Sequence, residues 1–325
     1  MTEAEPVLRL QDLKVHYPVR LGHGFGKSVL RAVDGVSLDI GRGECLGLVG
    51  ESGCGKSSLA QAVMGLVPVS SGRIALNGRE DWGADRLARA RMVQMVFQDP
   101  FSSLNPRQSI GQSLGGPLKL HGIANRSERE DRVATMLRKV GLNPDAAGRH
   151  PHEFSGGQRQ RIAIARALIV EPQLVVCDEP VSALDVSIRA QIINLLLELK
   201  DELGVALLMI SHDLGVVEHM SDRIAVMYLG RIVEEGDWRK IFTAPAHPYT
   251  RTLIAAIPDP ARPDAGWERL RGEAPSALAP PAGCAFHPRC AQAFGACRAG
   301  GVPEFTGLAD DHRARCHLLT EGASR

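Results

Sequence analysis

The stretch GESGCGKSS, from Gly50 to Ser58, fits the phosphate-loop pattern G-x-x-x-x-G-K-[ST]. It follows CLGLVG, a continuous apolar run typical of a buried parallel strand, and leads into KSSLAQAVMGL, whose apolar residues have helical spacing. A loop between such a strand and helix binds polyphosphate, because successive backbone N–H groups and the positive end of the helix face the same anion. The stretch therefore predicts an α/β protein that binds a nucleoside triphosphate.

The side chains of this loop have separate expected roles. Lys56 would reach the β- and γ-phosphates, and the Ser57 hydroxyl would ligate Mg²⁺. Cys54 lies at the start of the helix, where a thiol pKa tends to fall, so we expect alkylating reagents to inhibit nucleotide turnover. The residues of the loop expected to bind ATP are Gly50, Glu51, Ser52, Gly53, Cys54, Gly55, Lys56, Ser57 and Ser58.

A second motif, LVVCDEP, has the pattern of a buried strand that ends in two carboxylates. Asp178 would hold Mg²⁺ directly or through water, and Glu179 would polarise the attacking water or accept its proton. An Asp-Glu pair alone is more often a solvated loop, but the four apolar residues before this pair favour the end of a core strand. Asp178 and Glu179 are therefore the expected metal ligand and catalytic base.

The rest of the chain is organised around these two motifs. VLRLQDLKVHYPV and RAVDGVSLDIGRGE alternate apolar and polar residues, which predicts an antiparallel sheet near the N-terminus. Several helical stretches lie between about 106 and 167, and one of them is expected to begin at a Ser127 cap and to stop at Gly141. Short buried strands then alternate with helices, which predicts a mostly parallel core sheet.

Composition narrows the classes of function. Lys and Arg number 38 and Asp and Glu 37, so there is no broad basic field, and we expect no nucleic-acid partner. The start MTEAEPVLRL lacks the features of a secretory signal, and the longest apolar runs fall far short of the roughly 20 residues of a membrane span. We therefore expect a cytosolic protein that reaches a membrane only through partners.

EFSGGQRQRIAIARAL, from Glu153 to Leu168, offers a second anion-binding arrangement, a hydroxyl and backbone N–H groups at the start of a helix. This stretch resembles the signature of ATP-binding-cassette (ABC) ATPases, and the phosphate loop and the Asp178-Glu179 strand match the same family in order and spacing. The resemblance implies a head-to-tail dimer in which one subunit's phosphate loop and the other's signature enclose each ATP. The signature residues are Phe154, Ser155, Gly156, Gly157 and Gln158.

The resemblance also assigns roles to residues outside these motifs. Tyr17 is placed where an aromatic ring stacks on adenine, although it could equally be a strand aromatic. Gln98 matches the glutamine loop and completes an Mg²⁺ set with Ser57 and Asp178. His212 matches the switch histidine that approaches the γ-phosphate, whereas alone it would more often be a structural histidine. The D-loop that crosses the dimer is Ser182, Ala183, Leu184 and Asp185.

The implied fold is α/β: a P-loop NTPase of the ABC nucleotide-binding type over residues 1–245. It would have an N-terminal antiparallel β subdomain, a mixed or parallel core sheet, and an inserted α-helical subdomain at about 100–167. From about 245 the sequence is rich in Pro, Ala and Gly, which is typical of a linker and a small module. Residues 246–325 are therefore expected to form a Cys-rich C-terminal extension.

VFQDPFSSLNPR, CDEPVSALDVSIRAQI, HPYTRTLIAAIP and the cysteine tail together resemble the F-type ATP-binding subunits of oligopeptide and dipeptide importers. The resemblance implies that ATP hydrolysis powers import through two membrane permeases, which receive solute from an extracytoplasmic binding protein. It also implies a second ATPase subunit, a D-type paralogue, and a peripheral position at the cytoplasmic face of the inner membrane. One phosphate loop and one signature in this chain agree with such a pair.

Other functions stay open at this point. A soluble ABC ATPase of translation or DNA repair is one, although such proteins usually carry two cassettes or a long coiled coil, which this sequence lacks. An exporter ATPase is commonly fused to membrane spans, which are also missing. An importer of another solute, such as nickel chelates or glutathione, is equally compatible with the motifs, because an ATPase subunit does not contact the solute.

Four late cysteines are spaced Cys284-x5-Cys290-x6-Cys297-x18-Cys316. Disulfides are rare in the cytosol, and four thiolates can hold either a [4Fe–4S] cluster or zinc. GCAFHPRC and HRARCHL look like the C-terminal motif of peptide-importer ATPases, some of which carry an iron–sulfur cluster. We expect a [4Fe–4S] cluster, with zinc and free thiols as alternatives, because a module with few large apolar residues needs a staple.

Overall fold

The structure is a computed structural model that describes residues 5–20, 27–80, 82, 85–99, 103–257, 272–309 and 311–321. Most of the expected proline-rich linker lies outside the described residues. The helical insert is described from residue 103 onward.

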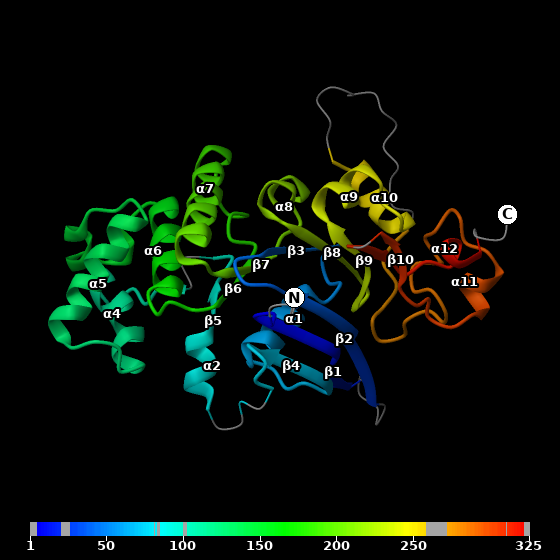
Figure 1. Cartoon of the computed structure of the whole chain (residues 1–325), viewed down its shortest axis with the longest axis horizontal. Coiled ribbons are helices and arrows are strands. Elements are labelled where there is room, and N and C mark those ends of the chain that lie inside the picture. Colours follow the sequence, from blue (N-terminus) through cyan, green and yellow to red (C-terminus); the bar gives the residue numbers. More distant parts are fainter. Residues whose placement is uncertain are drawn as a thin grey trace.

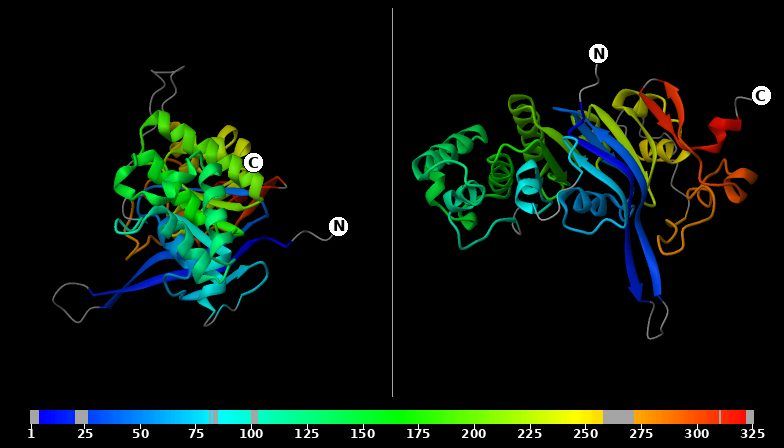
Figure 2. Two further views of the ribbon diagram at one scale, coloured as in Figure 1. Left: turned by 90° about the vertical axis from the view of Figure 1, so that its left-hand side faces the viewer. Right: turned by 60° about the horizontal axis from the view of Figure 1, so that its bottom comes forward.

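Three strands near the N-terminus form an antiparallel sheet in the order β2-β1-β4. They are β1 (Leu8–Arg20), β2 (Lys27–Ile40) and β4 (Ser71–Leu76). In β1 the apolar positions of the alternating pattern are buried, so the antiparallel sheet expected from that alternation is confirmed. Figure 2 shows β1 and β2 as a long ribbon that extends beyond the rest of the domain.

The core is an eight-stranded mixed sheet in the order β10-β11-β9-β8-β3-β7-β6-β5. Strands β8, β3, β7, β6 and β5 run parallel, while β9, β11 and β10 are antiparallel to their neighbours. The parallel strands are apolar runs buried on both faces, as the sequence predicted. The bounds are β3 (Cys45–Val49), β5 (Val93–Val96), β6 (Leu174–Asp178), β7 (Ala206–Ile210), β8 (Arg223–Tyr228), β9 (Arg231–Asp237), β10 (Thr306–Ala309) and β11 (His312–Ala314).

Helices gather at one end of the molecule and cover the core sheet (Figure 1). The helical insert is confirmed and holds α4 (Ile110–Leu120), α5 (Arg126–Lys139), two short 3₁₀ turns (Pro144–Gly148 and Pro151–Glu153) and α6 (Gly156–Leu168). The others are α1 (Lys56–Met64), α2 (Arg86–Met92), α7 (Val186–Leu203), α8 (Leu214–Met220), α9 (Trp238–Thr243), α10 (Pro248–Ala255), α11 (Gly295–Ala299) and α12 (His317–Glu321). Among the described helices, none is both long and apolar enough to cross a membrane.

The start of α5 differs from the sequence-based expectation. Ser127 is not its cap, because the helix begins one residue after Asn125. Asn125 accepts a hydrogen bond from the Glu128 N–H (3.1 Å), and Glu128 accepts one from the Asn125 N–H (2.9 Å). This reciprocal capping box satisfies two backbone donors at once, which fixes the first turn two residues earlier than Ser127 would.

The C-terminal module lies at the end of the molecule opposite α4 and α5 (Figure 1) and is joined to the core sheet. Strand β11 pairs with β9 and so extends the sheet at its edge. The fully buried carboxylate of Glu234 holds this junction, since it accepts hydrogen bonds from the Ala246 and His247 N–H groups and lies 2.8 Å from His312 Nε2. The module is therefore continuous with the core sheet.

Candidate nucleotide site

The phosphate loop lies between the end of β3 and the start of α1, at the carboxyl edge of the parallel strands. Glycine is required at two positions of the loop, because the backbone of other segments lies very close to them. A Cβ at Gly50 (φ 151°) would lie 2.2 Å from the Met227 carbonyl oxygen, and one at Gly55 (φ 113°) 2.0 Å from the Ala32 carbonyl oxygen. Only glycine fits these positions, so neighbouring backbone shapes the loop before any nucleotide binds.

Lys56 lies inside the loop with its amine against loop oxygens. Its Nζ donates to the carbonyl oxygens of Gly50 (2.7 Å) and Glu51 (2.9 Å), and only 7% of the residue is exposed. The amine is thus already within the cradle where a β- or γ-phosphate would take over these hydrogen bonds. This is the place expected from the sequence.

Cys54 requires a correction to the expected chemistry. Burial raises the pKa of its thiol, although the Lys56 ammonium acts in the opposite direction. Only 6% of Cys54 is exposed, because its side chain packs into the core beside the antiparallel sheet. The prediction of a lowered thiol pKa is therefore wrong: loss of hydration outweighs the attraction of the helix N-terminus and of Lys56.

Asp178 and Ser57, the expected Mg²⁺ ligands, lie next to each other. The Asp178 carboxylate is mostly buried at the end of β6, and burial raises its pKa, while a hydrogen bond from the Ser57 hydroxyl lowers it. A carboxylate and a hydroxyl in contact beside a phosphate cradle match the oxygen ligands of Mg²⁺. The two motifs, more than 100 residues apart in the chain, converge as expected.

Glu179 is the centre of a small polar cluster. Its Oε1 lies 2.9 Å from His212 Nδ1, and its Oε2 accepts a hydrogen bond from Gln98 Nε2 (3.0 Å). Its backbone has a φ of 48°, in the left-handed region, and its N–H donates to the Ile210 carbonyl (2.8 Å). A strained non-glycine backbone held by the next strand is typical of a residue that must point in one direction. Gln98, Glu179 and His212 are thus brought together.

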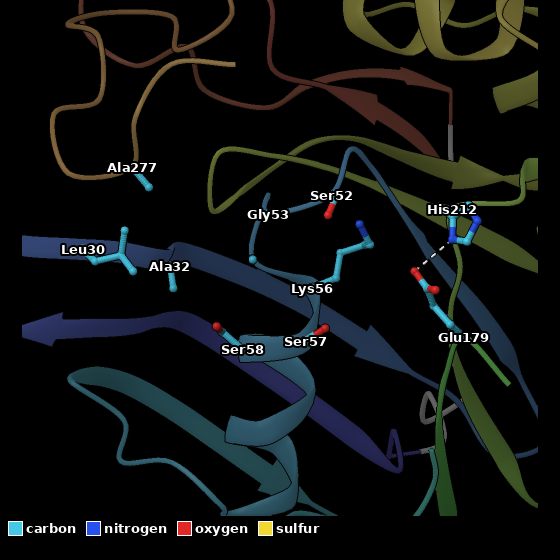
Figure 3. Close-up of a pocket in the computed structure, with 11 residues that line it drawn as sticks. Leu30, Ala32, Ser52, Gly53, Lys56, Ser57, Ser58, Glu179, His212 and Ala277 are labelled. Atoms are coloured by element: carbon cyan, nitrogen blue, oxygen red, sulfur yellow. Dashed lines mark hydrogen bonds and ion pairs between the residues drawn. The ribbon is translucent and has the colours of Figure 1, made fainter. Parts of the chain in front are cut away.

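A cavity of about 530 Å³ joins these parts. Figure 3 shows Lys56 and Ser57 on one side of it and the Glu179–His212 pair on the other. Leu30 and Ala32 of β2 form a further wall, together with Ala277 from the C-terminal module. Tyr17 pairs with Leu30 across the sheet and is not among the residues that line the cavity, so its stacking on adenine stays a prediction.

The signature lies at the start of α6, away from this cavity. Ser155 caps the helix, with its Oγ accepting from the Gln158 N–H (3.4 Å) and its own N–H donating to Gln158 Oε1 (3.0 Å). Phe154 is buried in the core beneath the helical insert. Gly156 and Gly157 pack against Leu184 and Ile188. The signature and D-loop are therefore neighbours within one chain.

The D-loop follows Glu179 directly. The Ser182 hydroxyl donates to the Glu179 carbonyl (3.1 Å), which ties the loop to the cluster of Gln98, Glu179 and His212. Asp185 occupies the N-cap position of α7, but its side chain accepts no capping hydrogen bond there. Ala183 lies between Ser182 and the partly buried Leu184. The roles of Ser182, Ala183, Leu184 and Asp185 across a dimer stay predictions.

Comparison with known proteins places this site in a family. Residues 33–182 match the ABC transporter family, and residues 233–297 match the family described as the oligopeptide/dipeptide transporter C-terminal region. The oligopeptide transport ATP-binding protein OppF of Salmonella typhimurium is 50% identical, over 87% of this chain and 88% of that protein. The chain belongs to the ABC transporter family.

Further similarities agree with this ABC assignment. The dipeptide transport ATP-binding protein DppF of Escherichia coli is 47% identical, over 91% of this chain and 90% of that protein. The dimeric, post-hydrolysis structure of the ATP-binding cassette MJ0796, bound to ADP and Pi, has a TM-score of 0.62 and 28% identity, over 71% of this chain and 99% of that one. The family and the site geometry together make the chain an ATPase.

Sequence reasoning missed part of this ABC site. Ala277 lines the cavity, Tyr249 accepts a hydrogen bond from the Glu51 N–H (2.8 Å), and Arg289 forms an ion pair with the Glu51 carboxylate. All three follow the core motifs in sequence, and nothing local marks them as site residues. Arg289 lies within the stretch GCAFHPRC, for which the sequence predicts a role of the cysteines alone.

The four late cysteines gather in the C-terminal module. The Cys284 N–H donates to the Cys297 carbonyl (3.0 Å). Burial, and to a smaller extent the nearby Cys284, Cys290 and Cys297 thiols, raise the pKa of Cys316 to about 11. Among the described residues, however, no three His, Cys, Asp or Glu side chains are arranged to hold a metal ion. The thiols converge without forming a preformed single-ion site.

Proposed function

We propose that this ABC ATPase powers the import of peptides through a membrane permease pair. The observation that carries the proposal is that one chain combines the Lys56–Asp178–Glu179 site with a C-terminal region of the oligopeptide/dipeptide transporter type. The relatives named for oligopeptide and dipeptide transport align over nearly their full lengths, which supports a shared solute class.

In the proposed reaction, Lys56 and the loop N–H groups bind the β- and γ-phosphates. Ser57, Gln98 and Asp178 are the proposed ligands of Mg²⁺, which would neutralise negative charge as it develops on the phosphates. Glu179 orients the attacking water and accepts its proton, while His212 holds the carboxylate and faces the γ-phosphate. Both side chains stand in the same cavity as the loop, which supports these roles.

We propose further that the working unit contains two ATPase subunits. Within the chain the signature of α6 does not line the cavity that holds Lys56, which supports its contact with an ATP bound to another subunit. We propose a D-type paralogue as that subunit, two permeases above the pair, and an extracytoplasmic binding protein that delivers solute to them. The ATPase would then lie at the cytoplasmic face of the inner membrane.

The four cysteines are proposed to hold a metal centre with a structural role. Their convergence supports it: each of the other three thiols raises the pKa of Cys316. Four cysteine thiolates can ligate either a [4Fe–4S] cluster or one zinc ion, and we propose the cluster. Anaerobic purification followed by iron and acid-labile sulfide assays tests for the cluster, and stoichiometric zinc in a colourless protein would reject the cluster.

Co-purification tests the proposed transport function. A tagged full-length chain, expressed with the proteins encoded beside it, should bring down a second ATPase and two polytopic membrane proteins in equal amounts. Stable association with ribosomes or DNA in place of membrane proteins would contradict the proposal and favour a soluble ABC ATPase. Uptake tests with peptides, nickel chelates and glutathione would then separate peptide import from the alternative solutes.

A further inference from the structure

The C-terminal module contacts the phosphate loop directly, at a residue whose side chain the nucleotide chemistry does not use. Arg289 donates from both Nη atoms to the carboxylate of Glu51, at 2.6 and 2.9 Å. The Arg289 side chain is 5% exposed and the Glu51 side chain 27%. A two-pronged, mostly buried guanidinium–carboxylate pair fixes orientation as well as charge.

A second contact holds the same loop residue through its backbone. The Glu51 N–H donates to the Tyr249 hydroxyl (2.8 Å), and Tyr249 is fully buried in α10. Burial lowers the pKa of His247 to about 3, so this imidazole is neutral and its Nδ1 accepts from the Tyr249 N–H (3.1 Å). Glu51 is thus gripped at its backbone by Tyr249 and at its side chain by Arg289.

Aromatic packing connects the Tyr249 and Arg289 contacts with Glu51. The ring of Phe286 lies 5.4 Å from that of Tyr249 and 5.3 Å from that of Tyr228, in an edge-to-face arrangement with the latter. The Arg289 guanidinium lies 6.0 Å from the Tyr228 ring centroid. Phe286 and Arg289 both belong to the short loop between Cys284 and Cys290, so that loop is anchored to the nucleotide site.

We propose that Arg289 is a positioning residue of the ATP site, which acts through Glu51 to hold the phosphate loop in the shape that accepts the triphosphate. The proposal rests on ATP binding by the ABC ATPase and not on the identity of the transported solute. It also gives the cysteine loop a function, because Arg289 immediately precedes Cys290.

Two physical effects carry this role. The loop contains glycines at positive φ, including Gly53 and Gly55, and a loop of this kind loses more conformational entropy when it is ordered on binding. The clamp on Glu51 removes part of that cost beforehand. Glu51 also places a carboxylate in the loop that receives an anion of several negative charges, and Arg289 neutralises it at short range. Without Arg289, the Glu51 carboxylate would repel ATP.

The test is equilibrium binding of MgAMP-PNP to the full-length chain, together with the steady-state kinetics of the assembled complex. Arg289→Ala should raise the Kd about tenfold and the KM for ATP by a similar factor, while kcat changes less than about twofold, because Glu179 and His212 are untouched. Arg298→Ala is the matched control, since Arg298 is an exposed arginine of the same module; its Kd should equal that of the wild type.

A second variant separates positioning from simple loss of stability. In Arg289→Ala/Glu51→Gln the repelling carboxylate is gone, so the Kd should return at least halfway, on a logarithmic scale, toward the wild-type value. A merely structural arginine would give no such recovery, and equal Kd values for Arg289→Ala and the wild type would overturn the proposal. If Arg289→Ala does not fold, Arg289→Lys carries the test: it keeps the charge without the two-pronged geometry, and an unchanged Kd would again overturn the proposal.

Discussion

We propose that turnover depends most directly on Glu179, because this residue contacts both Gln98 and His212 and lines the cavity of the phosphate loop. Its left-handed backbone and its N–H bond to Ile210 aim the carboxylate into that cavity. The arrangement leaves the carboxylate free to accept a proton from water while its position is fixed from two sides. Binding of ATP, by contrast, depends on Lys56 and the loop.

Glu179→Gln should therefore stop hydrolysis without loss of binding. The amide preserves the shape of the side chain but cannot take up a proton, so kcat should fall at least about a hundredfold, while the Kd for ATP should stay within about twofold. Phosphate release by the assembled complex and equilibrium ATP binding are the two measurements. Glu198→Gln, on the exposed face of α7, is the control and should change neither. Residual turnover near the wild-type rate would remove Glu179 from the catalytic role.

Cys54 should react slowly with alkylating reagents. Burial raises the pKa of its thiol and leaves 6% of the residue exposed, so at neutral pH little thiolate is present and little of it is reachable. Modification by iodoacetamide, followed by peptide mass spectrometry at pH 7 and at pH 9, should be slower than that of glutathione at both values and faster at the higher pH. Labelling as fast as glutathione at pH 7 would show that the loop opens or that the thiol pKa is low.

Residues of the site were predictable where a motif is local and not where contacts are long-range. Lys56, Ser57, Asp178 and Glu179 follow from strand, loop and helix patterns, because each lies beside the buried strand that positions it. Arg289 approaches Glu51 from 238 residues away, and no local pattern encodes such a pairing. The prediction of a lowered Cys54 pKa was wrong for a related reason. The position of Cys54 at the start of a helix is visible in the sequence, whereas its depth of burial is not.

At the scale of elements, Ser155 at the start of α6 has a structural role and a proposed role toward nucleotide. Ser155 closes a capping box at its N-terminus, and the same hydroxyl and N–H groups are proposed to meet the partner subunit's ATP. Helix α4 begins with the same device: Ser109 accepts from the Gln112 N–H (3.2 Å) and its own N–H donates to Gln112 (3.0 Å). The two helices therefore offer a matched comparison of capping with and without nucleotide contact.

Ser155→Ala and Ser109→Ala should destabilise the chain alike and differ in turnover. Loss of either cap should lower the free energy of unfolding by about 1 kcal/mol. Only Ser155→Ala should also lower the ATPase rate of the assembled pair, by about tenfold or more, since only Ser155 is proposed to face nucleotide. Denaturant unfolding and phosphate release measure the two effects. Equal ATPase rates for the two variants would contradict the proposed role of the signature.

Element boundaries show which sequence signals were ambiguous. Both Asn125 and Ser127 are good caps, and each has a glutamate three residues later, so the pattern alone could not choose between them. Strands β10 and β11 were not predicted, because TGLA and HRA are short and lack a clear alternation. Strand β11 pairs with the edge of β9, and β10 pairs in turn with β11. The buried parallel strands were predictable, since continuous apolar runs leave few alternatives.

At the scale of the whole molecule, the nucleotide site lies between two specialised ends (Figure 1). The helical insert carries the signature at one end, and the C-terminal module reaches the phosphate loop from the other. The shared sheet makes this possible, because β11 continues the same sheet whose central strand β3 leads into the loop. The phosphate loop, the signature and the cysteine module are thus linked through one continuous scaffold.

The central claim is that ATP hydrolysis at this site drives peptide import. Its most direct test is uptake of a labelled peptide by vesicles that hold the complete complex, with its permeases and binding protein, in the presence of ATP. We expect accumulation with the wild-type chain and none with Glu179→Gln, although the variant complex should assemble and bind ATP normally. Equal accumulation by the Glu179→Gln complex, or no ATP-dependent accumulation of any peptide by the intact wild-type complex, would contradict it.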